Sequence, residues 1–295
     1  MLSPVWPQAL PLLAGLIGLI IGSFLNVVIY RLPLMMEQQW AKECAEFTGE
    51  DADSGAETNV QAVAEPVFSL AQPRSRCPHC GHPIGWHENI PVVSYLFLRG
   101  KCSACGVGIS WRYPLVELIT AGLFYFCVAR WGATATAVVF CGFSAALVTL
   151  AMIDWDTTLL PDDITLPLVW SGLIVAALHW NPGVSLSNAM WGAVGGYLSL
   201  WVVYWAFKLI TGKDGMGFGD FKLFAALGAW FGWTALVPII LMASVLGAVV
   251  GMGLRWSSKL REGGYVPFGP FLAIAGLTAL FLGPQAILRW VGLAL

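Results

Sequence analysis

Long apolar segments alternate with shorter polar ones along this chain of 295 residues. A helix that crosses a bilayer needs about 20 mostly apolar residues, and the first such segment, residues 7–30, carries no charge. The later apolar segments contain only one acidic residue between them, and they are 113–129, 131–153, 164–207, 223–254 and 266–288. This pattern predicts an all-α polytopic membrane protein.

Two of the apolar segments are long enough to hold two helices each. The segment 164–207 is interrupted by Asn-Pro-Gly at 181–183, a turn signal that predicts a helix on either side. The segment 223–254 contains Gly232 and Pro238 near its first third. We expect two short crossings there, although its 32 residues are tight for two full spans.

The positions of the basic residues support this interpretation. Lys and Arg in short loops collect on the cytoplasmic side of a membrane. Two crossings in 223–254 give about eight transmembrane helices with both termini outside, and 13 of the 15 Lys and Arg residues then lie inside. A single crossing instead places three of them outside: Arg255, Lys259 and Arg261.

The chain is expected to have three parts. Residues 1–30 form the first transmembrane helix, 31–112 a cytoplasmic loop, and 113–295 the main membrane domain. The cytoplasmic loop divides again. Residues 37–65 contain eight acidic residues against Lys42 alone, which predicts a mobile loop, whereas the basic remainder contains two pairs of cysteines.

Composition agrees with a membrane protein and excludes other classes. Hydrophobic residues make up 58% of the chain and charged residues 11%, against roughly 45–50% and 25% in a soluble domain. The net charge of −2 provides no basic field. The expected partner is therefore the lipid bilayer and not nucleic acid.

Four cysteines form two Cys-x-x-Cys pairs separated by 21 residues: Cys77, Cys80, Cys102 and Cys105. Four thiolates suit a tetrahedral zinc ion, and a Cys₄ site has no open position for substrate. We therefore expect a small cytoplasmic zinc-binding module, structural in role, between the first and second membrane helices. A redox-active dithiol pair is the alternative. The nearby histidines are expected at the surface: His79, His82 and His87.

Two aspartates stand at the ends of apolar segments. Asp154 follows 131–153, and Asp220 follows the glycines Gly217 and Gly219 just before 223–254. Ionisable groups at membrane depth are costly and are functional candidates by default. Two neighbouring carboxylates share protons, so one acts as a base on water and the other as an acid on a peptide carbonyl.

Several neighbouring residues have simpler interpretations. Asp162 or Asp163 is expected to cap the following helix, and Lys222 to anchor at the interface. Asp156 is the alternative if Asp154 proves dispensable. Glycines four residues apart are expected to mark helix contacts, and they are Gly18 with Gly22 and Gly247 with Gly251.

The chain resembles the type IV prepilin leader peptidases, which are also N-methyltransferases. The resemblance extends almost from end to end. It rests on segments 22–33, 77–80, 89–95, 102–105, 112–117, 217–220 and 267–270.

This resemblance implies an aspartic protease of the bacterial inner membrane, with Asp154 and Asp220 as its catalytic pair facing the cytoplasm. It implies removal of the leader after a glycine from prepilins and pseudopilins. It also implies methylation of the new N-terminal residue, usually Phe, from S-adenosylmethionine. The sequence assigns no ligands to that methyl donor, and it leaves open whether pilus proteins, type II secretion proteins or both are cut.

Two other functions fit parts of the pattern. One is a Gly-x-Gly-Asp intramembrane protease without methyltransferase activity. A form that cuts within a substrate helix is disfavoured by the Cys₄ module and the segment Leu160-Pro161-Asp162, and methyl transfer from S-adenosylmethionine would discriminate a leader peptidase that only cleaves. The other is an ion-coupled transporter with proton-carrying aspartates, which is expected to contain inverted repeats, and the sequence contains none that we detect.

Overall fold

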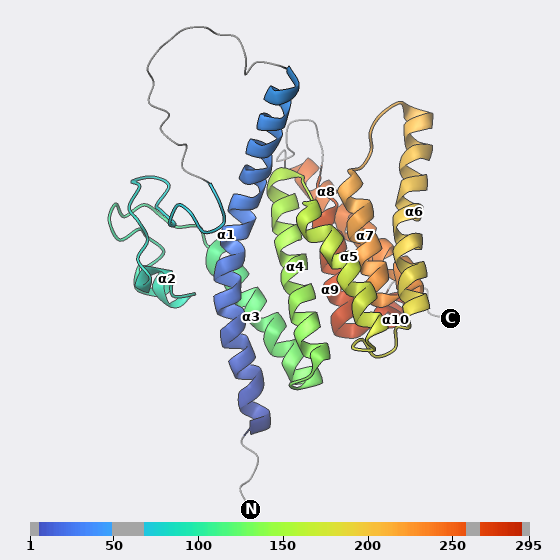
Figure 1. The fold of residues 1–295 in the computed structure, drawn as a ribbon, viewed down its shortest axis with the longest axis horizontal. Coiled ribbons are helices and arrows are strands. Elements are labelled where there is room, and N and C mark those ends of the chain that lie inside the picture. The colour runs from blue at the N-terminus through green and yellow to red at the C-terminus, as the bar shows by residue number, and fades with distance from the viewer. Residues whose placement is uncertain (1–5, 49–67, 258–265, 291–295) are drawn as a thin grey trace, which may run out of the picture. The chain divides into compact units, whose positions relative to one another are not determined.

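The computed structural model describes residues 6–48, 68–257 and 266–290. Its regular elements in these ranges are helices, as expected (Figure 1). Five of them are long and apolar enough to cross a membrane, and they are α1 (Trp6–Thr48), α3 (Arg112–Trp131), α4 (Ala135–Thr157), α6 (Leu186–Thr211) and α8 (Leu236–Trp256). The expectation of an all-α, multi-pass membrane protein is confirmed at this level.

The remaining helices are shorter. They are η1 (His87–Asn89), α2 (Val93–Phe97), α5 (Asp162–Ala177), α7 (Phe218–Phe231), η2 (Trp233–Ala235), α9 (Gly269–Leu282) and α10 (Pro284–Trp290). The chain divides into two compact units, Gly15–Gly122 and the combination of Met1–Ala14 with Leu123–Leu295. The first contains the cysteine pairs and the second contains both candidate aspartates.

Helix α1 is longer than the apolar pattern indicated. It continues beyond Arg31 to Thr48, so the expectation of a mobile loop is wrong over 37–48. Residues 37–48 contain no glycine and are rich in Glu, Gln and Ala, which favour a helix even where the surface is charged. The rest of the acidic segment lies outside the described residues.

Both long apolar segments are divided into two helices, as predicted. The turn at 181–183 separates α5 from α6. Gly232 ends α7 with a φ of +81°, a conformation that side chains other than glycine rarely adopt. Pro238 does not break a helix, because it lies in the first turn of α8, where its missing N–H has no intrahelical partner to lose.

In the larger unit, consecutive helices from α4 to α9 alternate in direction (Figure 1). Helix α7 packs against α5 and α6 and is almost wholly buried. Helices α6 and α7 meet backbone to backbone at Gly192 and Gly228, where a Cβ on either residue would overlap the backbone of the other. This close packing fixes α7, which carries Asp220 in its first turn, against α6.

One glycine of each small-residue pair contacts a neighbouring helix, as predicted. A Cβ on Gly22 would lie 2.7 Å from the Cα of Glu117 on α3. A Cβ on Gly247 would lie 3.2 Å from the Phe271 ring on α9. Each glycine therefore sets how closely its helix approaches the next one.

Candidate active site and metal centre

The structure brings the two candidate aspartates together. Asp154 lies in the last turn of α4 and Asp220 in the first turn of α7. Both residues are buried, with 4% and 7% of their surface exposed, and they lie close enough for the charge of Asp154 to act electrostatically on Asp220. The alternative residue, Asp156, is exposed to solvent. Two buried carboxylates at the ends of separate helices are groups of the kind that acid–base catalysis uses.

The carboxylate oxygens of the pair have different surroundings. Gly269 donates its N–H to Oδ2 of Asp154 over 2.9 Å, in a buried contact. Gly269 is the first residue of α9, and the first N–H groups of a helix have no intrahelical acceptor. Oδ1 of Asp220 is buried without a hydrogen-bond partner among the described residues.

Leu160 packs between two glycines that adjoin the aspartates. A Cβ on Gly219 would lie 2.6 Å from Cβ of Leu160, and a Cβ on Gly269 would lie 2.6 Å from Oδ2 of Asp154. Both hypothetical atoms would lie 3.2 Å from the same Cδ1 atom of Leu160. Gly217 is less constrained, because its Cβ would lie 3.8 Å from Oδ2 of Asp220, an ordinary contact. Side chains at Gly219 and Gly269 are therefore incompatible with this packing.

We expect Gly269→Ala to slow cleavage by about tenfold to a hundredfold, because a displaced reacting group loses rate at that scale. The new methyl group would push Asp154 away from the position in which it accepts the Gly269 N–H. The measurement is the initial rate of substrate cleavage by purified enzyme. Gly142→Ala is the matched control, because Gly142 lies on α4 with nothing within 4 Å of its Cβ position. A Gly269→Ala enzyme that cleaves as fast as the Gly142→Ala control would contradict the assigned packing.

An ion pair beside the aspartates was not predicted from the sequence. Nζ of Lys222 lies 2.6 Å from both carboxylate oxygens of Asp162. The cap expected of Asp162 is absent, since the N-cap of α5 is Pro161 without a side-chain hydrogen bond. Lys222 is therefore more than an interfacial anchor, because it joins α7 to the start of α5. The sequence signal for this pair was an acidic residue, Asp162, after the Asp154 segment and a basic residue, Lys222, after Asp220.

The four cysteines of the two pairs form one cluster. Their sulfur atoms all lie within 4.8 Å of one another. The Sγ atoms of Cys77 and Cys105 are 3.8 Å apart, and those of Cys80 and Cys102 are 4.0 Å apart. Tetrahedral zinc with bonds of about 2.3 Å requires sulfur atoms about 3.8 Å apart, so the cluster fits a zinc ion.

Two matching turns build the cluster. The N–H of Cys77 bonds to the carbonyl of His82, and the N–H of Cys102 bonds to the carbonyl of Val107. Gly81 and Gly106 follow the pairs, each with a φ of +71°. The repeated geometry presents two sulfur atoms from each turn to one point, as expected for a shared ion.

Backbone amides favour the thiolate form that binds metal. The N–H groups of Cys80 and His79 lower the pKa of the Cys77 thiol to about 6. The N–H groups of Cys105 and Ala104 likewise lower the pKa of the Cys102 thiol. Each turn therefore contains a cysteine whose ionised form is stabilised before any metal binds.

Two charged side chains attach the segments around the cysteine cluster to helices of the same unit. Arg31 on α1 is buried and donates to the carbonyls of Ser69, Leu70 and Pro73. Glu117 on α3 accepts the N–H of Val92 over 2.8 Å. The sequence marked Glu117 only as the single acidic residue of the later apolar segments, and it gave no partner for Arg31.

Comparison with known proteins identifies the family. The model of the bacterial peptidase A24 N-terminal domain matches residues 16–131, and that of the type IV leader peptidase family matches residues 141–252. A curated prepilin leader peptidase/N-methyltransferase of Aeromonas hydrophila is 50% identical over 283 residues, which cover 94% of this chain and 92% of the relative. A protein of the same name from Stutzerimonas stutzeri is 48% identical over 95% of this chain and 93% of its own length. One from Pseudomonas putida is 50% identical over 92% of this chain and 91% of its own length. No solved structure matches the chain. The agreement over nearly the whole length shows that the chain belongs to the type IV leader peptidase family.

Proposed function

We propose that this protein is a membrane-embedded aspartic endopeptidase that removes the leader peptide of type IV prepilins and pseudopilins after a glycine. It also N-methylates the new N-terminal residue with S-adenosylmethionine. The observation that carries the protease assignment is the buried, interacting pair Asp154 and Asp220. The names and lengths of the relatives support the combination of both activities.

In the proposed reaction, the carboxylate of the pair that is ionised takes a proton from water. The resulting hydroxide adds to the carbonyl carbon of the glycine, while the protonated partner donates to the carbonyl oxygen. The C–N bond then breaks, and the amine leaves with a proton. The two protons belong to the pair as a unit, so neither aspartate is assigned a fixed role. Gly269 orients Asp154 through its N–H.

The proposed topology has eight crossings, formed by α1 and by α3 to α9, with both termini outside. Three of these helices are short, namely α5, α7 and α9. This arrangement keeps 13 of the 15 Lys and Arg residues in the cytoplasm. It places the end of α4 and the start of α7, and therefore both aspartates, at the cytoplasmic face.

This topology suits the proposed substrates. A prepilin is retained in the bacterial inner membrane by its apolar helix, with its leader in the cytoplasm. Its scissile bond then lies at the membrane surface, at the level of Asp154 and Asp220. The division of the chain follows from the same proposal, with a first membrane helix in 1–30, a cytoplasmic loop in 31–112 and the aspartic peptidase domain in 113–295.

The cysteine module is proposed to hold zinc through Cys77, Cys80, Cys102 and Cys105. Four cysteines complete the tetrahedron that zinc prefers, so the ion supplies structural stability and offers no position to activate water. Hydrolysis therefore depends on the aspartates.

The deciding experiment incubates the purified protein with a prepilin and measures the product mass over time. We expect loss of the leader without S-adenosylmethionine, and an added methyl group when the donor is present. Cleavage without methylation in the presence of donor would favour the alternative, a Gly-x-Gly-Asp protease without methyltransferase activity. A prepilin that stays intact under both conditions would overturn the proposed function.

A further inference from the structure

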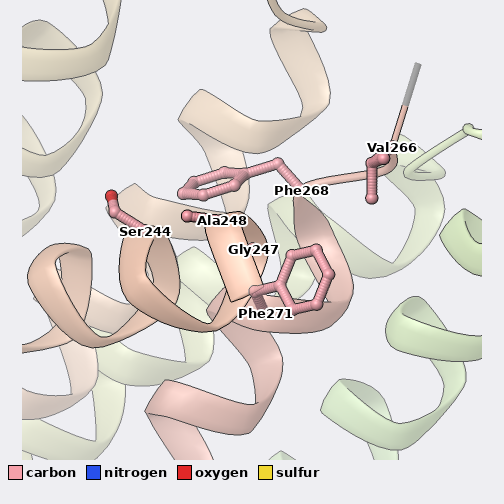
Figure 2. A pocket seen from close by; sticks show the side chains of 6 residues that line it. All are labelled: Ser244, Gly247, Ala248, Val266, Phe268 and Phe271. Atoms are coloured by element: carbon pink, nitrogen blue, oxygen red, sulfur yellow. The ribbon is translucent and has the colours of Figure 1, made fainter. Parts of the chain in front are cut away.

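Apolar side chains at the surface of the membrane-spanning helices need no special partner. The cavity of about 280 Å³ between α8 and the segment that leads into α9 is one example (Figure 2). Phe268 and Phe271 line it, and two more of its lining residues, Ser244 and Ala248, are exposed on α8, which is long enough to cross a membrane. Lipid tails are as apolar as these side chains and cover such a surface. The cysteine module, residues 68–111, contains no helix of that length, so its exposed apolar side chains require another explanation.

Helix α2 in the cysteine module turns apolar side chains outward. Val93, Leu96 and Phe97 have 46%, 69% and 84% of their surface exposed. Spacings of three and four residues place them on one face of the helix. Ile90, three residues before Val93, is exposed as well. These four residues form the apolar face of α2, and the described residues leave it uncovered.

Hydrogen bonds hold both ends of α2 beside the start of α3. At the first end, Val92 donates its N–H to Glu117 over 2.8 Å. Glu117 lies five residues into α3, which is about 8 Å along a helix. At the other end, Tyr95 donates its hydroxyl to the carbonyl of Ile109 over 3.3 Å, three residues before α3 begins at Arg112. Because α3 is long enough to cross a membrane, α2 lies at the level where this span leaves the bilayer.

The residues around the apolar face are those typical of a membrane surface. Trp86, just before η1, and Trp111, just before α3, are both exposed. Tryptophan is enriched at membrane–water interfaces, because its ring is apolar and its N–H is polar. Glu88 is the only acidic residue in 74–112, and four basic residues there are exposed: Arg74, Arg76, Arg99 and Lys101. An apolar helix face with basic residues and tryptophan around it suits an anionic phospholipid surface.

We propose that the apolar face of α2 inserts into the surface of the bilayer beside α3, and that the exposed basic residues bind the headgroups of anionic phospholipids. The cysteine module is then anchored on the membrane and does not hang free from its two flanking helices. Charge complementarity favours this partner, because the phosphate groups of lipids lie at the level at which α2 is held. This role does not involve the aspartates, so it goes beyond the proposed function.

A photo-crosslinker on the apolar face identifies what covers it. The full-length protein, with p-benzoylphenylalanine in place of Phe97, is reconstituted in nanodiscs of equal parts phosphatidylethanolamine and phosphatidylglycerol, illuminated and digested. We expect a phospholipid adduct on the peptide that contains residue 97. The matched control has the same group in place of Ala104, which is exposed in the turn of the second cysteine pair. Its lipid yield is expected to be at least about tenfold lower, the effect of burying one large apolar side chain.

The headgroup of the adduct tests the basic residues. A basic residue near an anionic surface strengthens association by about fivefold, so phosphatidylglycerol is expected to be enriched at least about threefold over phosphatidylethanolamine in the adduct. Arg99→Gln, two residues after α2, should lower this enrichment. Lys42→Gln should leave it unchanged, because Lys42 is an exposed base on α1 outside the cysteine module.

Three outcomes would overturn this anchoring role. Cross-links from residue 97 to another peptide of this chain, or to a second copy, would show that protein covers the apolar face. Equal lipid yields at residues 97 and 104 would show that α2 is not inserted, and adducts without enrichment of phosphatidylglycerol would exclude the basic residues. Leu96 provides a second position on the same face if the group at residue 97 unfolds the protein. Cleavage of a prepilin enters none of these measurements, so a failure here is distinct from a failure of the proposed function.

Discussion

Asp154→Asn and Asp220→Asn are each expected to abolish leader removal, with a loss of at least about 10²–10⁴-fold, the contribution of a positioned acid or base. An amide has nearly the shape of the carboxyl group but neither takes a proton from water nor donates one to the carbonyl oxygen in the same way. Both carboxyl groups are buried and interact with each other. The loss therefore follows from chemistry and not from a change in packing.

The measurement is the rate at which the leader is released from a prepilin by enzyme purified in detergent. Asp156→Asn is the matched control, because Asp156 lies on the same helix and is exposed. Each variant is checked for membrane insertion and helix content, so that a misfolded protein is not taken for an inactive one. Robust cleavage by Asp154→Asn combined with inactivity of Asp156→Asn would move the catalytic role to Asp156.

The two aspartates could be selected as candidates from the sequence because charge is scarce in this chain. Only 11% of residues are charged, so a carboxylate at the boundary of an apolar segment has few structural explanations. The same scarcity allowed the basic residues to indicate a topology. A soluble protein of equal length, with more than twice this share of charge, does not isolate its functional acids in this way.

The supporting residues were not predictable from their types. Leu160 and Gly269 belong to residue types that are abundant in membrane helices, and their roles come from a three-way contact with Gly219 that exists only after folding. Segment 267–270 matched the family pattern, but nothing in its spacing indicated a hydrogen bond to Asp154. Local patterns identify the residues that carry chemistry, whereas tertiary packing decides which residues hold them.

The extent of α1 shows a second limit of pattern analysis. Acidic and polar residues after position 37 predicted a loop, yet the helix continues to Thr48. Polarity indicates contact with water and not the absence of a helix. The absence of glycine between Arg31 and Thr48 was the better guide.

A double substitution, Cys77→Ser with Cys80→Ser, is expected to have the second large effect. It removes half of the proposed zinc ligands, and structural zinc sites of this kind contribute apparent binding energies of about 10–16 kcal/mol. We expect the purified variant to lose its zinc and residues 68–112 to become sensitive to protease. Zinc content by elemental mass spectrometry and limited proteolysis measure these two results without depending on activity.

Cys44→Ser is the matched control, because Cys44 lies on α1 outside the cluster, and it should keep both zinc and protease resistance. The two turns have the same geometry, with a φ of +71° at Gly81 and at Gly106. The pair Cys102→Ser with Cys105→Ser should therefore give the same loss as the first pair. Retention of one zinc per chain in either double variant would refute the shared Cys₄ site. A tetrahedral ion depends on both turns to the same degree. Different zinc losses from the two double variants would therefore show that the two turns do not contribute equally to the site.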